Sequence, residues 1–173
     1  MSARSARLLR RQVTRILEQC KVKGPAVPVA KIARQLGAEI RFVPYEGELA
    51  GMFARYSDGK AVIGINSKLP KSRQRYTIAH ELGHFVLHDL DMHIDRDFRT
   101  PGKDKDVDKI NEELETEANR FAAELLMPYD MLMPELEQHG IDMEHLDEVG
   151  TLAKRYDVST QAMMRRIASL IPF

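Results

Sequence analysis

The sequence is poor in cysteine, in net charge and in long hydrophobic runs. Its single cysteine, Cys20, cannot form a disulfide within the chain, which favours a reducing compartment. The 26 Lys and Arg residues balance the 26 Asp and Glu residues, so no overall field draws the protein to nucleic acid or to an acidic membrane. No internal repeat or low-complexity tract interrupts the 173 residues, a length that fits one ordinary domain.

The N-terminal segment is basic, but no long apolar run follows it. Its apolar residues recur at helical spacing instead, as Leu9, Val13, Ile16 and Leu17 do. We therefore expect an amphipathic helix with a solvated basic face rather than a secretory signal. No segment is long and apolar enough to be expected to span a bilayer, and a cytoplasmic location is the expectation.

The first half of the chain predicts two helices followed by strands. Hydrophobic spacing predicts helices over residues 5–21 and 28–36, and alternation predicts a strand over 38–43. Two further alternating runs, 51–56 and 60–66, flank Ser57-Asp58-Gly59. Asp-Gly between alternating runs is a strong β-hairpin signal, so these runs are expected to pair.

The second half is expected to be mostly helical. Apolar stripes predict long helices over residues 73–88, with Ser72 as the N-cap, and 108–127, ended by Pro128. The intervening residues 89–108 are rich in Asp, Lys and Arg and predict a surface loop. Two or three more helices follow residue 128. We expect one domain over 1–173, with a core of about 24–133 and a helical tail of 134–173.

The helix predicted over 73–88 carries His80-Glu81-Leu82-Gly83-His84. Residues four apart lie on nearly the same face of a helix, so His80 and His84 can point their imidazoles at one ion. Zinc accepts such nitrogens at about 2.0–2.1 Å in a tetrahedral shell. Glu81 is turned aside and can reach a water held by the ion, which is the place of a general base in a zinc hydrolase.

Two histidines leave a zinc shell incomplete, so a third ligand must come from elsewhere. Glu115 continues the buried stripe of the second long helix, and we choose it as the third ligand. Glu117, two residues on, is the alternative. Asn119, one turn after Glu115, is placed to hydrogen-bond a ligand. Water is expected at the fourth position.

The two helices together resemble a known family. Residues 75–84 (RYTIAHELGH) and 115–128 (ETEANRFAAELLMP) are similar to the ImmA/IrrE family of zincin-like metallopeptidases. Ile65-Asn66 and the run that begins at His93 also resemble that family, with Tyr76 standing where Phe is usual. The likeness is strong over about 51–132. It implies an α+β, zincin-like fold: a small antiparallel sheet packed with the HExxH helix and a second ligand-bearing helix, and a mostly helical C-terminal part.

The resemblance also implies a function. Members are intracellular bacterial or mobile-element proteases that cut or inactivate a helix-turn-helix repressor and so relieve repression. The prediction is a zinc endopeptidase with Zn²⁺ on His80, His84 and Glu115, Glu81 as general base, and such a repressor as substrate or partner. The alternative is a non-proteolytic regulatory or toxin–antitoxin binding protein with a structural zinc, although such a scaffold has no chemical use for Glu81.

Two features stay open at this level. His93 either lines the site, where it could stabilise an oxyanion, or is a solvated loop histidine; His88 is expected to support the site rather than bind metal. Residues 149–167 resemble half of a helix-turn-helix motif. Because the neighbouring residues 135–148 are acidic, packing on the core is favoured over contact with DNA.

Overall fold

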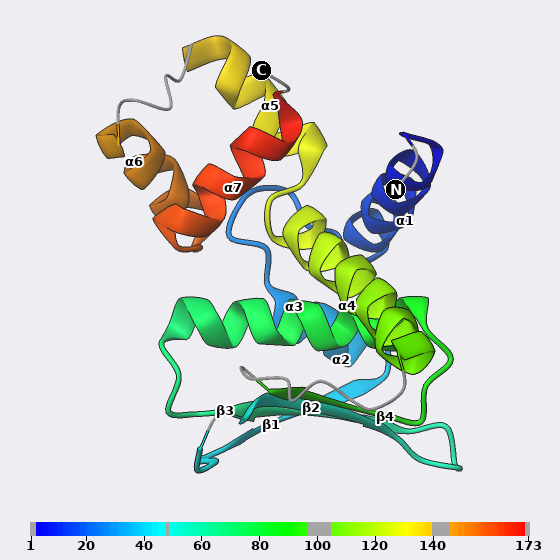
Figure 1. Cartoon of the computed structure of the whole chain (residues 1–173). Coiled ribbons are helices and arrows are strands. Elements are labelled where there is room, and N and C mark those ends of the chain that lie inside the picture. The colour runs from blue at the N-terminus through cyan, green and yellow to red at the C-terminus, as the bar shows by residue number, and fades with distance from the viewer. Residues whose placement is uncertain (1–2, 48, 97–104, 140–145, 172–173) are drawn as a thin grey trace. The chain divides into compact units, whose positions relative to one another are not determined.

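A computed structural model describes residues 3–47, 49–96, 105–139 and 146–171 (Figure 1). The chain forms two compact units, which we call the sheet unit (residues 29–122) and the helical unit (residues 1–28 and 123–173). The elements are, in chain order, α1 (Ala3–Gln19), α2 (Val29–Gln35), β1 (Ala38–Val43), β2 (Leu49–Arg55), β3 (Ala61–Asn66), α3 (Lys71–Leu87), β4 (Met92–Arg96), α4 (Lys105–Leu126), α5 (Tyr129–His139), α6 (Leu146–Tyr156) and α7 (Thr160–Leu170).

The sheet has four strands in the order β1-β3-β2-β4. The predicted hairpin is confirmed: β2 and β3 pair antiparallel, and Gly59 in the connecting turn has a φ of +82° that favours glycine. On the other side of β2, β4 pairs antiparallel as well, with Phe53 opposite His93. β4 is therefore the outer strand next to β2 among the described residues.

The α+β class is confirmed, but two details of the prediction are wrong. β1 pairs with β3 in parallel, because the β2–β3 hairpin turns β3 back alongside β1, so the sheet is mixed rather than antiparallel. The predicted loop over 89–108 contains β4, and its last residues already belong to α4. The many charged residues of this stretch indicated a loop. They are compatible with a short strand because only one face of that strand is covered. Residues 97–104 lie outside the described part of the chain.

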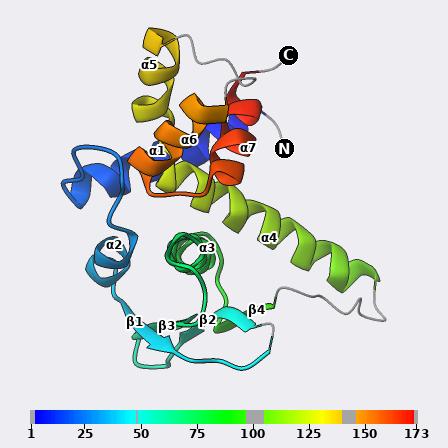
Figure 2. The same ribbon diagram turned by 90° about the vertical axis from the view of Figure 1, so that its left-hand side faces the viewer.

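Helix α3 lies on one face of the sheet and contacts β2 and β3, with α2 beside it (Figure 2). The core between these layers includes the fully buried side chains of Phe53, Ile63, Ile65 and Leu82. Each such burial stabilises the fold by about 1.5–3 kcal/mol. Gly51 lets helix and sheet approach, since a Cβ there would collide with the Thr77 side chain and lie 3.3 Å from Glu81 Oε1.

The predicted N-cap of α3 is also wrong. The helix begins at Lys71, its N-cap position is Pro70, and no side chain caps it there. Gln74 instead donates its side-chain amide to the carbonyls of Ser67 and Leu69, which holds the entering turn. A polar residue near a helix start is therefore not sufficient to set its first turn.

The helical unit contains α1, the last residues of α4, and α5 to α7. Its buried side chains include Cys20, which directly follows α1. Helices α6 and α7 pack together, and Ser159 caps α7 by accepting a hydrogen bond from the backbone N–H of Ala162. Within the ranges that the structure describes, no helix combines the length and apolarity that crossing a bilayer requires.

Candidate metal centre

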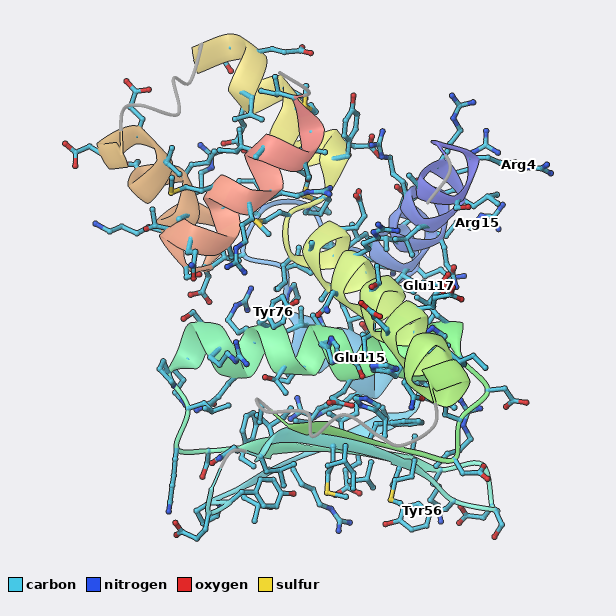
Figure 3. The ribbon with its side chains drawn as sticks, viewed as in Figure 1. Arg4, Arg15, Tyr56, Tyr76, Glu115 and Glu117 are labelled. Carbon is cyan, nitrogen blue, oxygen red and sulfur yellow. The ribbon has the colours of Figure 1, made fainter. Side chains whose placement is uncertain are left out.

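Three elements of the sheet unit bring polar side chains to one buried point. His80 and His84 lie one turn apart on α3 and are both buried, with their Nε2 atoms 3.2 Å apart. Gly83, between them, lets α4 come close, because a Cβ there would lie only 3.1 Å from the Cα of Ala118. This close approach carries Glu115 of α4 to the histidine pair. Figure 3 labels Glu115 where α4 passes α3.

The separations of these donor atoms suit a tetrahedral metal ion. Glu115 Oε2 is 3.4 Å from His80 Nε2, and Glu115 Oε1 is 3.7 Å from His84 Nε2. Zinc bonds of about 2.0–2.1 Å at tetrahedral angles place neighbouring ligand atoms roughly 3.3–3.4 Å apart. The separations of 3.2, 3.4 and 3.7 Å, the last two measured to the two oxygens of one carboxylate, are close to that spacing. Two imidazoles and a carboxylate are also donors that zinc prefers.

Hydrogen bonds on the far side of each imidazole fix its tautomer. Asn119 Oδ1 accepts from His80 Nδ1 at 3.0 Å and from the Tyr76 hydroxyl at 2.7 Å. This leaves the lone pair of His80 Nε2 facing the centre. Such outer partners orient a ligand and raise its basicity.

A longer chain of hydrogen bonds does the same for His84. Its Nδ1 lies 3.0 Å from Nδ1 of His88, and Nε2 of His88 lies 3.2 Å from the Glu117 carboxylate. Because the carboxylate only accepts, His88 donates to Glu117 and accepts from His84. His84 Nε2 is then an acceptor turned to the centre. Glu117 thus lies two hydrogen bonds away from the donor triangle, on a mostly exposed side chain.

Glu81 is fully buried on α3 and meets a histidine from the sheet. Nδ1 of His93, on β4, lies 3.0 Å from Glu81 Oε2, and its Nε2 lies 2.7 Å from Glu115 Oε1. The His93 ring also stacks on the ring of His84, with centroids 3.7 Å apart. One donor atom each from His80, His84, His93 and Glu115 falls within 4.8 Å of the others.

Burial and charge shift the protonation of this cluster. Burial first, and then the neighbouring imidazoles of His93 and His80, lower the pKa of His84 to about 2, so this ligand candidate is neutral. Burial alone would lower the pKa of His93, but its hydrogen bonds to Glu115 and Glu81 raise it to about 9. Burial would raise the pKa of the Glu115 carboxyl, yet the neighbouring imidazoles of His80 and His93 hold it below its usual range.

The structure brings together the residues that the sequence pattern singled out. His80, His84 and Glu115 form the donor triangle, Glu81 lies beside it, and Asn119 and His88 hold the imidazoles from behind. Glu117, the alternative third ligand, meets His88 instead. Sequence reasoning left His93 undecided, because it was taken to lie in a loop. The sequence around it holds no signal that it faces inward, because alternation would place the apolar Met92 and Ile94 on the buried face, whereas the structure leaves both exposed.

The sequence profile of the IrrE N-terminal-like domain, a peptidase family, matches residues 33–168. The chain belongs to this family. It is 31% identical over 137 residues to the radiation response metalloprotease IrrE of Deinococcus radiodurans, and 34% identical over 133 residues to that of Deinococcus deserti. These alignments cover 79% and 76% of the chain but only 38% and 43% of those relatives. The chain thus spans less than half the length of either metalloprotease.

The chain is also similar to a phage protein and to a solved structure. It is 31% identical over 123 residues to the uncharacterized immunity region protein 2 of Bacillus phage phi105, covering 70% of the chain and 69% of that protein. A solved structure, a Mycobacterium tuberculosis transcriptional regulator, superposes with a TM-score of 0.58 at 16% identity, over 92% of this chain and 46% of the other. At that identity the likeness shows a shared fold.

Proposed function

We propose that the protein is a zinc-dependent endopeptidase that inactivates a helix-turn-helix transcriptional repressor. His80, His84 and Glu115 would hold the zinc, and Glu81 would act as general base. The observation that carries the proposal is the fully buried Glu81 carboxylate beside a zinc-sized triangle of donors. Burying a carboxylate costs free energy, and a purely structural metal site has no chemical use for that carboxylate.

The chemistry assigns a distinct task to each residue. When bound, zinc would polarise the scissile carbonyl and lower the pKa of water toward about 7. A Glu81 oxygen takes the proton of the attacking water and returns it to the departing amide nitrogen. Asn119 and the His88–Glu117 pair keep the two imidazoles in the tautomer that presents Nε2.

The substrate class rests on the edge of the sheet and on the relatives. β4 carries His93 to the site and is the outer strand beside β2 among the described residues. A protease must hold an extended segment, and pairing along such an edge supplies backbone hydrogen bonds without demanding one sequence. The phage immunity-region relative and the metalloprotease relatives support a regulatory target, and the family resemblance points to a repressor.

The test compares Glu81→Gln with the wild type in cells that carry a reporter promoter and a helix-turn-helix repressor encoded beside the protease. The amide is nearly isosteric but cannot accept the proton, so cleavage should fall by about 10²–10⁴-fold while zinc is retained. Glu113→Gln, an exposed change on α4, is the matched control and should cleave normally. Repressor integrity is followed on a gel alongside promoter activity.

The same experiment separates the proposal from a scaffold function. If Glu81→Gln relieves repression as well as wild type while the repressor stays whole, binding alone is the mechanism. A non-proteolytic regulatory or toxin–antitoxin role with a structural zinc would then replace the peptidase. Zinc content of the purified variants, measured by atomic emission, ensures that a lost activity is not a lost metal.

A further inference from the structure

The backbone of β4 fixes where the His93 side chain points. Side chains alternate along a strand, and the neighbours Met92 and Ile94 are 59% and 41% exposed, whereas the His93 side chain is 14% exposed. His93 lies opposite Phe53, whose ring is fully buried. Turning His93 outward would need a one-residue slip of the β2–β4 register, which would place Met92 or Ile94 on the inward face instead.

His93 turns its two ring nitrogens in the same directions as the two helical histidines, although its Nε2 donates to a carboxylate and would release that proton on binding a metal. His80 and His84 each turn Nε2 to the centre and engage Nδ1 with a partner behind. His93 also turns Nε2 to the centre, against Glu115, and engages Nδ1 with the Glu81 carboxylate at 3.0 Å. A histidine with one nitrogen toward a metal and the other on a carboxylate is the usual arrangement of a zinc ligand.

We propose that His93 is a displaceable fourth zinc ligand that closes the shell in the resting protein. The donor set is then His80, His84, His93 and Glu115, the four residues whose donor atoms cluster within 4.8 Å. The 2.7 Å between His93 Nε2 and Glu115 Oε1 is shorter than a tetrahedral edge of roughly 3.3–3.4 Å, so on binding one ion the two atoms would move apart and the His93 ring would move off the His84 ring on which it stacks. Four protein ligands are the mark of a closed zinc site, whereas an open catalytic site has three and water.

In this closed state Glu81 is engaged as the hydrogen-bond partner of His93. Withdrawal of His93 therefore does two things in one movement: it opens the fourth position and releases the base. β4 pairs with one neighbouring strand among the described residues. A segment that pairs along its outer side would therefore shift β4 and move His93 with it. The inference rests on the proposed zinc site and makes the peptidase latent until its substrate or partner engages β4.

The number of imidazoles on the ion tests the proposal directly. X-ray absorption at the zinc edge of the wild-type protein should fit three imidazole nitrogens near 2.0–2.1 Å, and His93→Ala should fit two. Met92→Ala, an exposed change on the same strand, is the matched control and should keep three. A wild-type spectrum that fits two imidazoles overturns the proposal even if His93→Ala fails to fold.

Cobalt substitution gives a second readout that does not depend on cleavage. With four protein ligands, the visible absorption of the cobalt form should not change on adding azide. His93→Ala opens a position to solvent and should respond to azide, whereas Met92→Ala should not. A wild-type response as large as that of His93→Ala overturns the closed site. A chain that binds no metal instead overturns the proposed function itself, so the two failures are distinct.

Discussion

The two units of the molecule both bury charged groups, but they dispose of them differently. In the helical unit, Glu124 and Arg166 are 8% and 9% exposed and form an ion pair, and Glu124 also accepts the backbone N–H of Tyr129. In the sheet unit, His80, His84 and Glu115 present acceptor atoms to one another. Charge in the first unit is neutralised by the chain. In the second unit, acceptor atoms face one another across a point that a shared cation would suit.

The contrast teaches how to tell a structural polar cluster from a functional one. Arg166 closes its cluster twice, through Glu124 and through its Nε–H donated to the Met127 carbonyl. In the donor triangle, the outer nitrogen of each imidazole is hydrogen-bonded, and the inner nitrogens point to a common centre. That arrangement is typical of a metal site, whereas charged groups that pair only with each other are typical of a buried ion pair.

The largest expected effect breaks the pairing in the helical unit. Arg166→Met leaves the Glu124 carboxylate buried, which typically costs about 3–5 kcal/mol. We expect the lower end of that range, because Arg10 lies 4.0 Å from the same carboxylate. Urea unfolding measures the loss. Zinc content should stay at the wild-type level, and its loss would mean that the two clusters are not independent.

A double variant serves as the control for that experiment. Glu124→Gln with Arg166→Met removes both charges, so the free energy of unfolding should recover most of what the single variant loses. If the double variant is as unstable as the single one, packing of the Arg166 stem, and not charge, stabilises the unit.

The next effect concerns the third ligand. Loss of an outer partner lowers metal affinity by about 10–100-fold, so Glu115→Ala, which removes the proposed third ligand, should lower it by more than about a hundredfold. Glu117→Ala acts through His88 and His84 and should cost about tenfold or less. Competition with a chelator measures both affinities. The larger loss in Glu117→Ala would mean that the ligand phase along α4 is displaced by two residues.

The helical part of the candidate site and the hairpin could be predicted from the sequence. Spacing of four on one helix predicts that His80 and His84 converge, and an apolar stripe predicts the phase of Glu115, because both are local consequences of 3.6 residues per turn. The hairpin was equally accessible, since Asp-Gly specifies its turn.

Pairing between strands that are distant in the sequence could not be predicted in this way, because it leaves no local pattern. β4 has five residues, and its partner β2 lies about forty positions earlier, so nothing near His93 indicates what it faces. The parallel β1–β3 pairing is likewise a choice among sheet orders that share the same strand patterns. The site was therefore predictable on its helices and not on its sheet, and the residue left undecided is the one that the sheet contributes.

A smaller effect tests how closely α3 and α4 must approach. A Cβ at Gly83 would lie 3.1–3.2 Å from the backbone of Ala118 and the Phe121 ring, which cannot move aside independently. Gly83→Ala should therefore cost about 1–3 kcal/mol as overpacking and weaken zinc binding by drawing Glu115 away. Gly64→Ala is the control, because the atoms nearest to its Cβ would belong to the side chains of Tyr45 and Met52 and not to a neighbouring backbone. Equal zinc affinities in the two variants would show that the helix spacing does not set the site.

The smallest expected effect lies in the helical unit, where the buried Tyr156 donates its hydroxyl to Glu135 at 3.0 Å. Tyr156→Phe removes one hydrogen bond and should cost about 1 kcal/mol. The penalty stays small because Glu135 retains Arg155 at 3.5 Å and some exposure to water. Zinc affinity should not change, in contrast to every variant of the donor triangle.

The pH dependence of that variant gives the sharper measurement. Burial first, and then the hydrogen bond to Glu135, raises the pKa of Tyr156 above its ordinary value. A raised pKa means that the neutral phenol stabilises the fold fully below the unfolded-state pKa of about 10. As pH rises past that value the unfolded chain loses the proton first, so stability declines until the folded-state pKa is passed. The free energy of unfolding of the wild type should therefore fall more steeply between about pH 9 and 11 than that of Tyr156→Phe. Parallel curves would show that Tyr156 has the same pKa in the folded and unfolded states. The Tyr156–Glu135 hydrogen bond would then not be an example of polar groups that are stabilised by pairing within the helical unit.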